Sequence, residues 1–301
     1  MRSSGFDRYQ PREISFADEL FSVNMDRTHE LLDGMIRIRV PRRTRFWVQT
    51  HVNFVDEHLL RRLKEAGCYL CGLGIETGND DALRTMGKGS SLRMVREAFL
   101  AARKADLDVM AFFMLGHPGE TVDSIKRTVA LAVELNPKLP LFGLTVPYPG
   151  TEVARLAARQ EAGYRLVSTD WDDFNKQLGG ALEFAGLARW QIERHQLIAY
   201  LTVFLKNGRF VDLASFVWRY RTSGVQLVSK ILKGLVGSRR EGPIASRPPS
   251  FRIREAMEAA YSRWEKMQAR SSRQARLDAE PARIRVIDRK HAHNSAFGDA
   301  A

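Results

Sequence analysis

The sequence predicts an α/β fold: an open, partial (β/α) barrel of about five parallel βα units, followed by C-terminal helices. Apolar runs with strand character begin near residues 12, 46, 69, 108 and 141, and helical patterns lie between them. This repeat of 23 to 39 residues is typical of a parallel sheet with right-handed crossovers. Five units are too few to close an eight-fold barrel, so we expect it to be open.

The expected strands are the short runs rich in β-branched, aromatic and aliphatic residues. They are Arg12–Ala17, Phe46–Thr50, Tyr69–Ile75, Asp108–Leu115 and Leu141–Val146. Residues 70–75 and 109–115 are apolar at nearly every position, which predicts strands covered on both faces.

Three apolar stripes at helical spacing predict the connecting helices. The stripe of helix residues before Gly67 has Asp56 and Glu57 in its first turn, and the stripe before Pro137 is ended by that proline. The stripes are Leu59, Leu60, Leu63 and Ala66; then Met94, Ala98, Ala101, Ala102 and Ala105; and then Ile125, Val129, Ala132, Val133 and Asn136.

The chain divides by composition into four parts. Residues 1–162 carry the partial barrel, and residues 163–236 read as a helical C-terminal extension, with helices over Ala188–Asn207, Val211–Thr222 and Gln226–Leu235. Residues 237–250 are rich in Arg, Pro, Gly and Ser and predict a linker. Residues 251–301 predict a basic amphipathic helix over Phe251–Ala269 and then a disordered tail.

The bulk composition is that of a soluble protein. The sequence has 301 residues, 44% of them hydrophobic, and no apolar run approaches the ~18 residues of a transmembrane helix. Only two cysteines are present, which excludes a disulfide framework and favours a reducing cytoplasm. The net charge is +12, of which residues 237–290 carry +7. Clustered cations can bind nucleic acid, an anionic membrane or an acidic partner. Tyr261 and Trp264 are the only aromatic residues between Arg252 and Lys290, which is thin support for base stacking.

Two similar turns connect expected strands to expected helices. Leu115–Thr121 reads LGHPGET and Pro147–Thr151 reads PYPGT, each with glycine where the backbone bends or a ligand approaches. Each turn ends in threonine, a good N-cap, which leaves backbone N–H groups pointing outward at the sheet edge. Two such turns predict a ligand site at the C-terminal edge of the sheet.

Polar or glycine residues follow nearly every expected strand. In parallel sheets, active and binding sites lie at these C-terminal strand ends. Asp18 and Glu19 follow the first strand, and Glu76 follows the third. Carboxylate acceptors beside glycine turns suit a ligand with hydroxyl and amino donors, such as a nucleoside. The candidate site residues are Asp18, Glu19, Glu76, Gly116, His117, Pro118, Gly119, Tyr148 and Pro149.

An ordered series of motifs over residues 12–151 resembles the radical S-adenosylmethionine (radical SAM) superfamily. The segments that carry the resemblance are FADELF at 16–21, AGC at 66–68, GIETGN at 74–79, Leu83 with Lys88-Gly89, and the two turns already described. The closest branch is the one that often carries a cobalamin-binding domain.

The resemblance implies roles for the candidate residues. Asp18 and Glu19 would hold the methionine amino group of S-adenosylmethionine, and Glu76 would contact its ribose. The turn from Gly116 to Gly119, with His117 and Pro118, and the segment around Tyr148 and Pro149 would flank the methionine and adenine moieties. Intact relatives also bind a [4Fe–4S] cluster, and some bind cobalamin.

The sequence departs from the family at the cluster loop. The family's C-x3-C-x2-C motif is absent, and the two cysteines, Cys68 and Cys71, are expected to point to opposite faces of a strand. They read as two small buried hydrophobes, so no metal ligands are assigned. Without cluster thiolates, this chain has no electron source for reductive cleavage of the sulfonium.

Three hypotheses follow. The leading one is a C-terminal fragment or split subunit of a radical SAM protein, which retains part of the S-adenosylmethionine site and is active, by hydrogen abstraction or methyl transfer, only with an N-terminal cluster-bearing segment or subunit. The alternative is a non-catalytic module that binds nucleic acid or an acidic partner through its basic C-terminal region. An aldolase-like barrel with Glu76 as base is disfavoured, because no lysine or metal-ligand cluster follows the strands. Neither the small-molecule substrate nor any catalytic residue is assigned.

Overall fold

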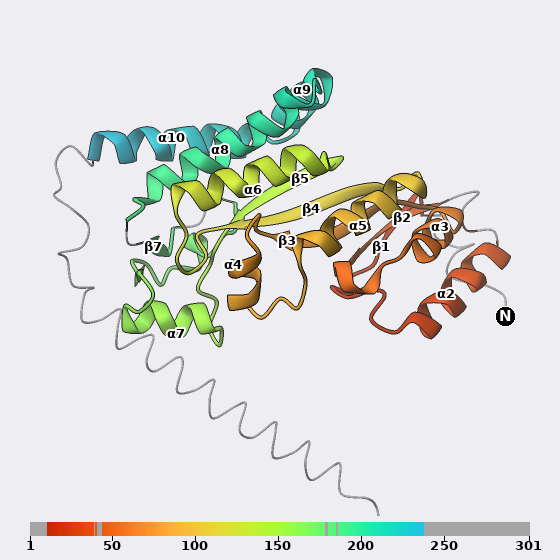
Figure 1. The fold of residues 1–301 in the computed structure, drawn as a ribbon. Coiled ribbons are helices and arrows are strands. Elements are labelled where there is room, and N and C mark those ends of the chain that lie inside the picture. Colours follow the sequence, from red (N-terminus) through yellow and green to blue (C-terminus); the bar gives the residue numbers. More distant parts are fainter. Residues whose placement is uncertain (1–10, 39, 41–43, 178–179, 185, 238–301) are drawn as a thin grey trace, which may run out of the picture.

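A five-stranded parallel sheet forms the centre of the molecule (Figure 1). The computed structural model describes residues 11–38, 40, 44–177, 180–184 and 186–237. The strands follow chain order across the sheet and are β1 (Glu13–Ser15), β2 (Arg45–Thr50), β3 (Cys68–Glu76), β4 (Asp108–Leu115) and β5 (Leu139–Leu144). Every neighbouring pair is parallel, which confirms the predicted open half-barrel.

The connecting helices bury the apolar core against one face of this sheet. The helices that do so are α2 (Met25–Arg37), α3 (Glu57–Glu65), α5 (Leu92–Lys104) and α6 (Val122–Leu135). The connections also contain α4 (Asp80–Thr85) and a 3-10 turn at Val52–Phe54, and α7 (Glu152–Arg159) follows β5 and packs Ala154 and Ala157 into a separate apolar cluster. Alternate strand residues such as Leu73 and Ala111 share one cluster with Leu63 of α3, Phe99 of α5 and Leu131 of α6. Right-handed crossovers between neighbouring parallel strands place successive helices on the same side, as in a closed barrel.

The second face of the sheet is only partly covered, so the prediction of strands buried on both faces was wrong in part. Leu70, Gly74, Phe112 and Met114 are half-buried, whereas their neighbours on the helix-covered face are buried. An open barrel has this consequence, because five strands cannot curl far enough to fill the interior with their own side chains. A concave, half-exposed inner face results.

Two of the predicted helical stripes hold and one is displaced. Leu59, Leu60, Leu63 and Ala66 are fully buried, as predicted. On α5 the buried residues are Val95, Ala98, Phe99 and Ala102, and Ala101 packs against the core as predicted. Met94 is only half-buried, so the buried face is displaced from Met94 toward Phe99. The alanine-rich pattern hid Phe99, whose larger apolar area determines which side of the helix turns inward. On α6, Ile125 and Ala132 are buried as predicted, and Val129 and Val133 pack against the core. The prediction for Asn136 was wrong, because it caps the helix with a left-handed φ and is exposed.

A two-stranded antiparallel sheet follows the barrel and was not predicted. It consists of β6 (Tyr164–Leu166) and β7 (Leu182–Phe184), which are too short to show a period-two pattern. The predicted helices of the extension are present as α8 (Arg189–Lys206), α9 (Phe210–Arg219) and α10 (Arg221–Gly237). The expected linker after residue 237, the helix Phe251–Ala269 and the tail lie outside the described residues.

Helix α8 closes the exposed edge of β5. Gln196 Nε2 donates to the carbonyl of Phe142 at 2.7 Å, and the Phe142 N–H donates to the Tyr200 hydroxyl at 3.0 Å. Side chains thus satisfy backbone groups that a sixth strand would otherwise pair, which is one way that proteins protect edge strands. None of the described helices is long and apolar enough to cross a membrane.

Candidate functional site

The predicted site residues follow the strands at one edge of the sheet, because all five strands run in the same direction. Asp18 and Glu19 come three and four residues after the end of β1, and both are exposed. Asp18 Oδ1 lies 3.9 Å from Arg27 Nη1, a loose contact between two solvated groups. The acidic pair therefore remains accessible to a cationic ligand.

Glu76, at the end of β3, has an unusual backbone conformation. Its φ angle is +69°, in the left-handed region that non-glycine residues rarely adopt, and the pairing of β3 with β4 shifts register between Gly74 and Glu76. Such a conformation costs on the order of 1–3 kcal/mol and tends to occur where function requires it. The strained backbone makes Glu76 the strongest candidate of the set.

The side chain of Glu76 forms a half-buried ion pair with Lys88. Lys88 Nζ lies 2.6 Å from Glu76 Oε1, and the two side chains are 23% and 22% exposed. Gly74 makes room for this pair, because a Cβ at position 74 would lie 3.0 Å from Lys88 Nζ and 3.2 Å from Glu76 Oε1. Gly74 and Glu76 therefore form one arrangement with Lys88, which belongs to the motif series but was not among the predicted site residues.

Two further residues near Lys88 were not among the predicted site residues. His51, at the end of β2, accepts through Nδ1 from the Asn53 N–H at 3.2 Å, and Asn53 Nδ2 donates to the Gly89 carbonyl at 2.8 Å. Burial and the nearby Lys88 ammonium lower the pKa of His51. The sequence signal for Lys88 as a site residue was its position between Gly87 and Gly89. Both glycines have positive φ, which allows this loop to fold back over the strand ends.

Gly78, two residues after Glu76, anchors the end of β3 on α6. A Cβ at this position would come within 2.6 Å of the Arg127 carbonyl oxygen, so only glycine fits. The Gly78 N–H donates to Thr128 Oγ1 at 2.9 Å, and Thr77 Oγ1 lies 3.2 Å from the same hydroxyl. The helix thus fixes the backbone immediately beyond the strained glutamate.

The first glycine of the Gly116–Gly119 turn is covered by protein, contrary to the expectation that a ligand approaches it. Gly116 has φ +89°, and a Cβ there would lie 2.4 Å from Phe184 Cζ of β7. Its carbonyl accepts a hydrogen bond from the Tyr164 hydroxyl of β6 at 2.9 Å. The close approach that requires glycine is made by an aromatic ring of the small sheet. Gly119, with φ +74° and no atom within 4 Å of a Cβ, is the open glycine of the turn.

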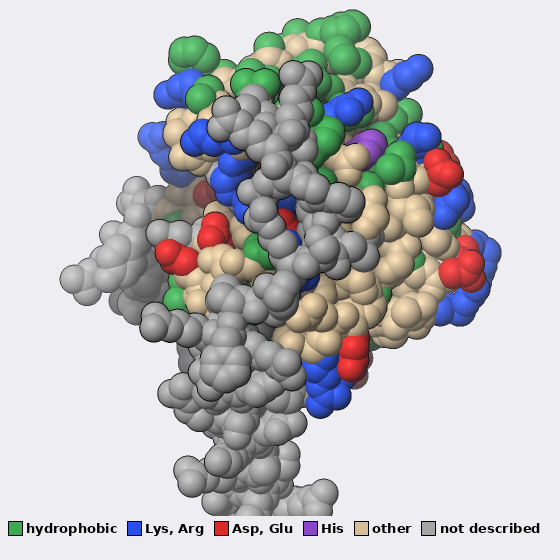
Figure 2. All heavy atoms as spheres, turned by 90° about the vertical axis from the view of Figure 1, so that its left-hand side faces the viewer, with side chains coloured by type: hydrophobic (Ala, Val, Ile, Leu, Met, Phe, Trp, Pro, Cys, Tyr) green, Lys and Arg blue, Asp and Glu red, His purple; other side chains and the backbone are tan. Residues whose placement is uncertain are grey.

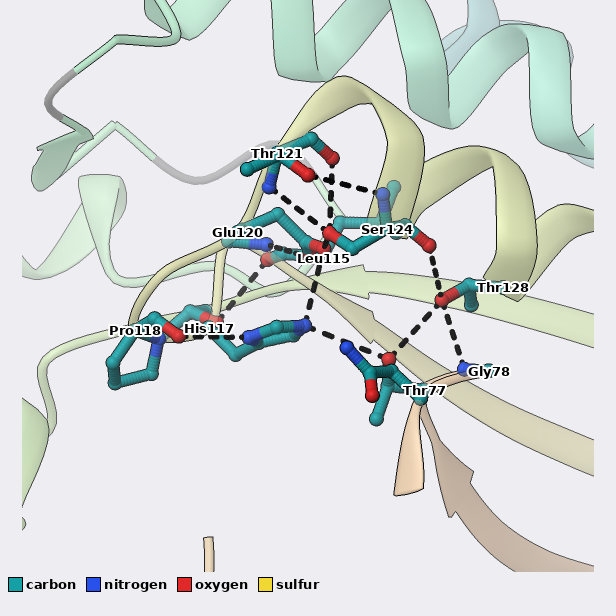
Figure 3. A network of polar contacts seen from close by, with 12 residues as sticks. Thr77, Gly78, Leu115, His117, Pro118, Glu120, Thr121, Ser124 and Thr128 are labelled. Atoms are coloured by element: carbon teal, nitrogen blue, oxygen red, sulfur yellow. Dashed lines mark hydrogen bonds and ion pairs between the residues drawn. The ribbon is translucent and has the colours of Figure 1, made fainter. Parts of the chain in front are cut away.

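His117 points inward and is the centre of a buried polar network (Figure 3). Its Nε2 lies 3.0 Å from Glu120 Oε1 and 3.5 Å from Thr77 Oγ1, and its Nδ1 lies 3.1 Å from the Pro118 carbonyl. Both ring nitrogens therefore face protein groups, which leaves neither for a bound molecule. His117 thus supports the turn from within, and its place among the ligand-contacting residues stays a prediction.

The network continues through Glu120 into α6. Glu120 accepts from the Gly116 N–H at 3.1 Å and from the hydroxyl of Ser124. Ser124 and Thr121 form a capping box at the start of α6. Burial disfavours the charged form of His117, but its contacts with Glu120 and the Pro118 carbonyl outweigh burial and raise its pKa. The His117–Glu120 pair thus ties the turn to α6.

The Pro147–Thr151 turn leaves Pro149 exposed, whereas Tyr148 is partly buried. The Tyr148 hydroxyl donates to the Phe174 carbonyl at 3.2 Å, and Thr151 caps α7 as predicted. A pocket beside this turn, at the end of β5, is lined by residues that include Thr145, Pro147, Asp173, Phe184 and Arg189. The Arg189 guanidinium donates to Glu193 Oε1 at 3.0 Å and to the Gly180 carbonyl at 3.2 Å.

The cysteines do not form a metal site. Cys68 and Cys71 are both buried in the main core, as predicted. The prediction that they point to opposite faces was wrong, because β3 pairs Cys68 with Phe46 and Cys71 with Val48 across a register shift, and this places both thiols on the helix-covered face. Burial raises the pKa of Cys68 to about 12 and also raises the pKa of Cys71, so both are protonated at neutral pH. Within the described ranges, no three His, Cys, Asp or Glu residues are grouped so that they could hold a metal ion. The residues present therefore do not fit a [4Fe–4S] cluster, which needs thiolate ligands.

Comparison with known protein families identifies the fold. The model of the radical SAM superfamily matches residues 7–132, which contain β1 to β4 and most of α6. Residues 7–132 form a radical SAM domain. The expectation from the motif series is thereby confirmed, because the match covers the acidic pair, the GIE segment and the Gly116–Gly119 turn of the domain.

Relatives of this radical SAM domain include proteins described as methyltransferases. An uncharacterized methyltransferase of Pyrococcus horikoshii is 27% identical over 199 residues, which are 66% of this chain and 42% of that protein. Bacteriochlorophyllide d C-12(1)-methyltransferase of Chlorobaculum tepidum is 28% identical over 177 residues, 56% of this chain and 37% of that enzyme. The chain thus matches less than half the length of either relative.

The radical SAM methyltransferase TsrM from Kitasatospora setae, solved with cobalamin and a [4Fe–4S] cluster bound, is a similar structure. It aligns with a TM-score of 0.49 and 17% identity, covering 65% of this chain and 42% of TsrM.

Proposed function

We propose that this radical SAM protein binds S-adenosylmethionine along the C-terminal edge of its sheet, over the half-exposed inner face. Glu76 carries the proposal, because it combines a strained backbone with a carboxylate positioned where parallel sheets bind ligands. One carboxylate oxygen accepts from Lys88, and the remaining lone pairs are suited to ribose hydroxyl donors. The exposed carboxylates of Asp18 and Glu19 suit the methionine ammonium.

Within this site His117 has a positioning role. The buried pair with Glu120 holds the backbone of the Gly116–Gly119 turn, in which Pro118 is half-buried and Gly119 is exposed. Rigid backbone at a turn supplies hydrogen-bonding groups without a conformational cost on binding. The ligand would therefore contact the outer half of the turn, and the inner half would act as its support.

The proposed reaction class is methyl transfer, since two of the relatives are described as methyltransferases. A chain with two buried cysteines cannot supply three cluster thiolates. We therefore assign to this chain the binding and orientation of S-adenosylmethionine, and we assign the cluster ligands to another polypeptide segment or subunit. The basic region on which the nucleic-acid alternative depends lies outside the described residues.

Binding of S-adenosylhomocysteine, measured by calorimetry or ligand-observed NMR, tests this proposal without a cluster. We expect a dissociation constant in about the high-micromolar range, because the cluster normally chelates the methionine end and each ~1.4 kcal/mol is tenfold in affinity. Glu76→Gln should weaken binding about tenfold or more, since it removes charge-assisted hydrogen bonds of ~1.5–3 kcal/mol. Glu97→Gln is the matched control, because Glu97 is an exposed carboxylate on α5 paired with Arg93 at 2.6 Å.

The proposal fails if folded protein shows no binding at millimolar ligand. It also fails if Glu76→Gln and Glu97→Gln bind equally well, because the ligand would then occupy a different site. Far-UV circular dichroism of each variant establishes that a loss of binding is not a loss of fold.

A further inference from the structure

The three C-terminal helices expose an unusual amount of apolar surface. On α9, Phe210, Val211, Val217 and Trp218 are 64%, 80%, 53% and 71% exposed. Their spacing of i, i+1, i+7 and i+8 places them on one side of the helix. Isolated exposed apolar residues need no explanation, but a contiguous stripe of large ones indicates an interaction surface.

The neighbouring helices continue this surface. On α10, Val225, Val228 and Leu232 are 71%, 42% and 57% exposed at spacings of three and four residues. On α8, Ile198, Leu201 and Leu205 are between 36% and 48% exposed at the same spacings. Figure 2 shows hydrophobic side chains gathered at the top of the molecule, where α8, α9 and α10 lie in Figure 1. We call these ten residues of α8, α9 and α10 the apolar face.

Basic residues accompany the apolar face, and acidic residues are nearly absent. Residues 198–235 contain six Lys or Arg and one Asp, a net charge of +5. The acidic residue, Asp212, is already paired with Arg209 at 2.8 Å. Lys206, Arg219, Arg221 and Lys233 are exposed. Blue side chains border the green ones at the top of Figure 2.

One pair of residues shows how the two kinds of surface combine. The Arg221 guanidinium lies 4.7 Å from the centre of the Trp218 ring, and its Nη1 donates to the Trp218 carbonyl at 2.8 Å. An exposed tryptophan with a cation on its face is amphipathic, with an apolar ring beside a charged group. That is the chemistry of the boundary between lipid tails and headgroups.

The charge distribution indicates which kind of partner fits the apolar face. A second copy of the chain would bring +5 against +5, which is repulsive. A nucleic acid would use the cations but would leave the aliphatic stripes of α8 and α10 exposed, since bases stack on aromatic side chains. An anionic lipid surface uses both features, because its headgroups attract the cations and its acyl boundary takes up the apolar side chains.

We propose that the apolar face of α8, α9 and α10 docks the protein peripherally on an anionic membrane surface. None of the described helices can span a bilayer, so the attachment is one of helices lying in the interface. The sheet edge that carries Glu76 belongs to a different part of the fold, so attachment does not depend on the proposed S-adenosylmethionine site.

Co-sedimentation of the full chain with vesicles tests this inference. Vesicles of phosphatidylglycerol and phosphatidylcholine should bind the protein, whereas vesicles of phosphatidylcholine alone should bind it at least about tenfold more weakly. Val211→Ser with Trp218→Ser removes apolar contacts, and Arg219→Gln with Lys233→Gln removes two charges. The affinity of each double variant for anionic vesicles should fall about tenfold or more. One cation near the membrane surface corresponds to about a fivefold change in affinity.

Matched controls make the test specific. Leu100→Ser with Trp171→Ser removes similarly exposed side chains, 53% and 67%, outside the apolar face. Arg37→Gln with Arg103→Gln makes the same change in net charge on exposed positions of α2 and α5. Both control variants should bind anionic vesicles as tightly as the unaltered chain does. All variants keep residues 238–301, so any binding by that segment is the same in each.

Three outcomes would overturn the proposal. The first is no binding to anionic vesicles. The second is equal loss in the control variants, or loss in the charge variant alone, since either would indicate unspecific attraction of a basic chain. The third is concentration-dependent self-association that Val211→Ser with Trp218→Ser abolishes in the absence of vesicle binding, which would assign the face to a second copy.

Discussion

The ring of Phe184 lies directly against Gly116, so that a Cβ at position 116 would come within 2.4 Å of Phe184 Cζ. The contact joins the small β6–β7 sheet to the turn that follows β4. It also explains why the turn begins with glycine, because both the backbone angle and the available space exclude a larger residue.

Replacement of this glycine should therefore destabilise the fold in two ways. Gly116→Ala combines a positive φ, which costs about 1–2 kcal/mol, with overpacking against Phe184, which costs about 1–3 kcal/mol. Gly119→Ala is the control, since its φ is +74° but nothing lies within 4 Å of a Cβ. Urea unfolding should show the larger loss for Gly116→Ala, and Phe184→Ala in the same chain should relieve part of it. Equal losses for the two glycines would contradict the contact.

Gly74 and Gly78, on either side of Glu76, should differ sharply in how well they tolerate substitution by alanine. Gly78→Ala should cost more than about 3 kcal/mol, because the new methyl group meets the Arg127 backbone at 2.6 Å and cannot displace it. Gly74→Ala should cost about 1 kcal/mol, because its nearest neighbour is the flexible end of Lys88. The free energies of unfolding of the two variants provide the comparison. The reverse order would mean that the end of β3 does not pack on α6 as described.

The His117–Glu120 pair should make stability depend on pH near neutrality. The pKa of His117 is raised in the folded protein, so its contribution is complete below the unfolded value of about 6.5 and is lost as pH rises through the folded pKa. Glu120→Gln should therefore destabilise the protein more at about pH 6 than at about pH 8. The free energies of unfolding of the unaltered protein and of Glu120→Gln, measured at the two pH values, test this.

A carboxylate elsewhere supplies the comparison for that experiment. Glu152→Gln removes an exposed carboxylate whose partner is Arg155, a group that does not titrate in this range. Its effect should be the same at both pH values. If Glu120→Gln behaves in the same way, His117 does not titrate against Glu120.

The cysteines should be inert in the folded protein. Because burial raises the pKa of both thiols, a disulfide reagent should modify neither until the chain is unfolded in urea, after which both should react. Reconstitution of the isolated chain with iron and sulfide should give no stoichiometric [4Fe–4S] spectrum. A cluster spectrum that Cys68→Ala and Cys71→Ala abolish would show that the core opens to expose these thiols.

The sequence by itself determined the order and type of the main elements. Apolar strands alternating with amphipathic helices predict a parallel sheet with right-handed crossovers, because few other arrangements connect such elements. The N-caps Thr121 and Thr151 and the buried Leu59, Leu60 and Leu63 were predictable for the same reason, since local hydrogen bonding and periodicity decide them. The motif series identified the radical SAM domain.

Only the tertiary structure decided what surrounds each motif residue. It turned His117 inward onto Glu120, placed Phe184 on Gly116 and brought Lys88 against Glu76 from twelve residues away. It also showed that Glu76 holds a left-handed backbone angle. These features depend on contacts between segments that are distant in the chain or on a backbone strain that the whole fold must sustain, and neither leaves a periodic pattern in the sequence.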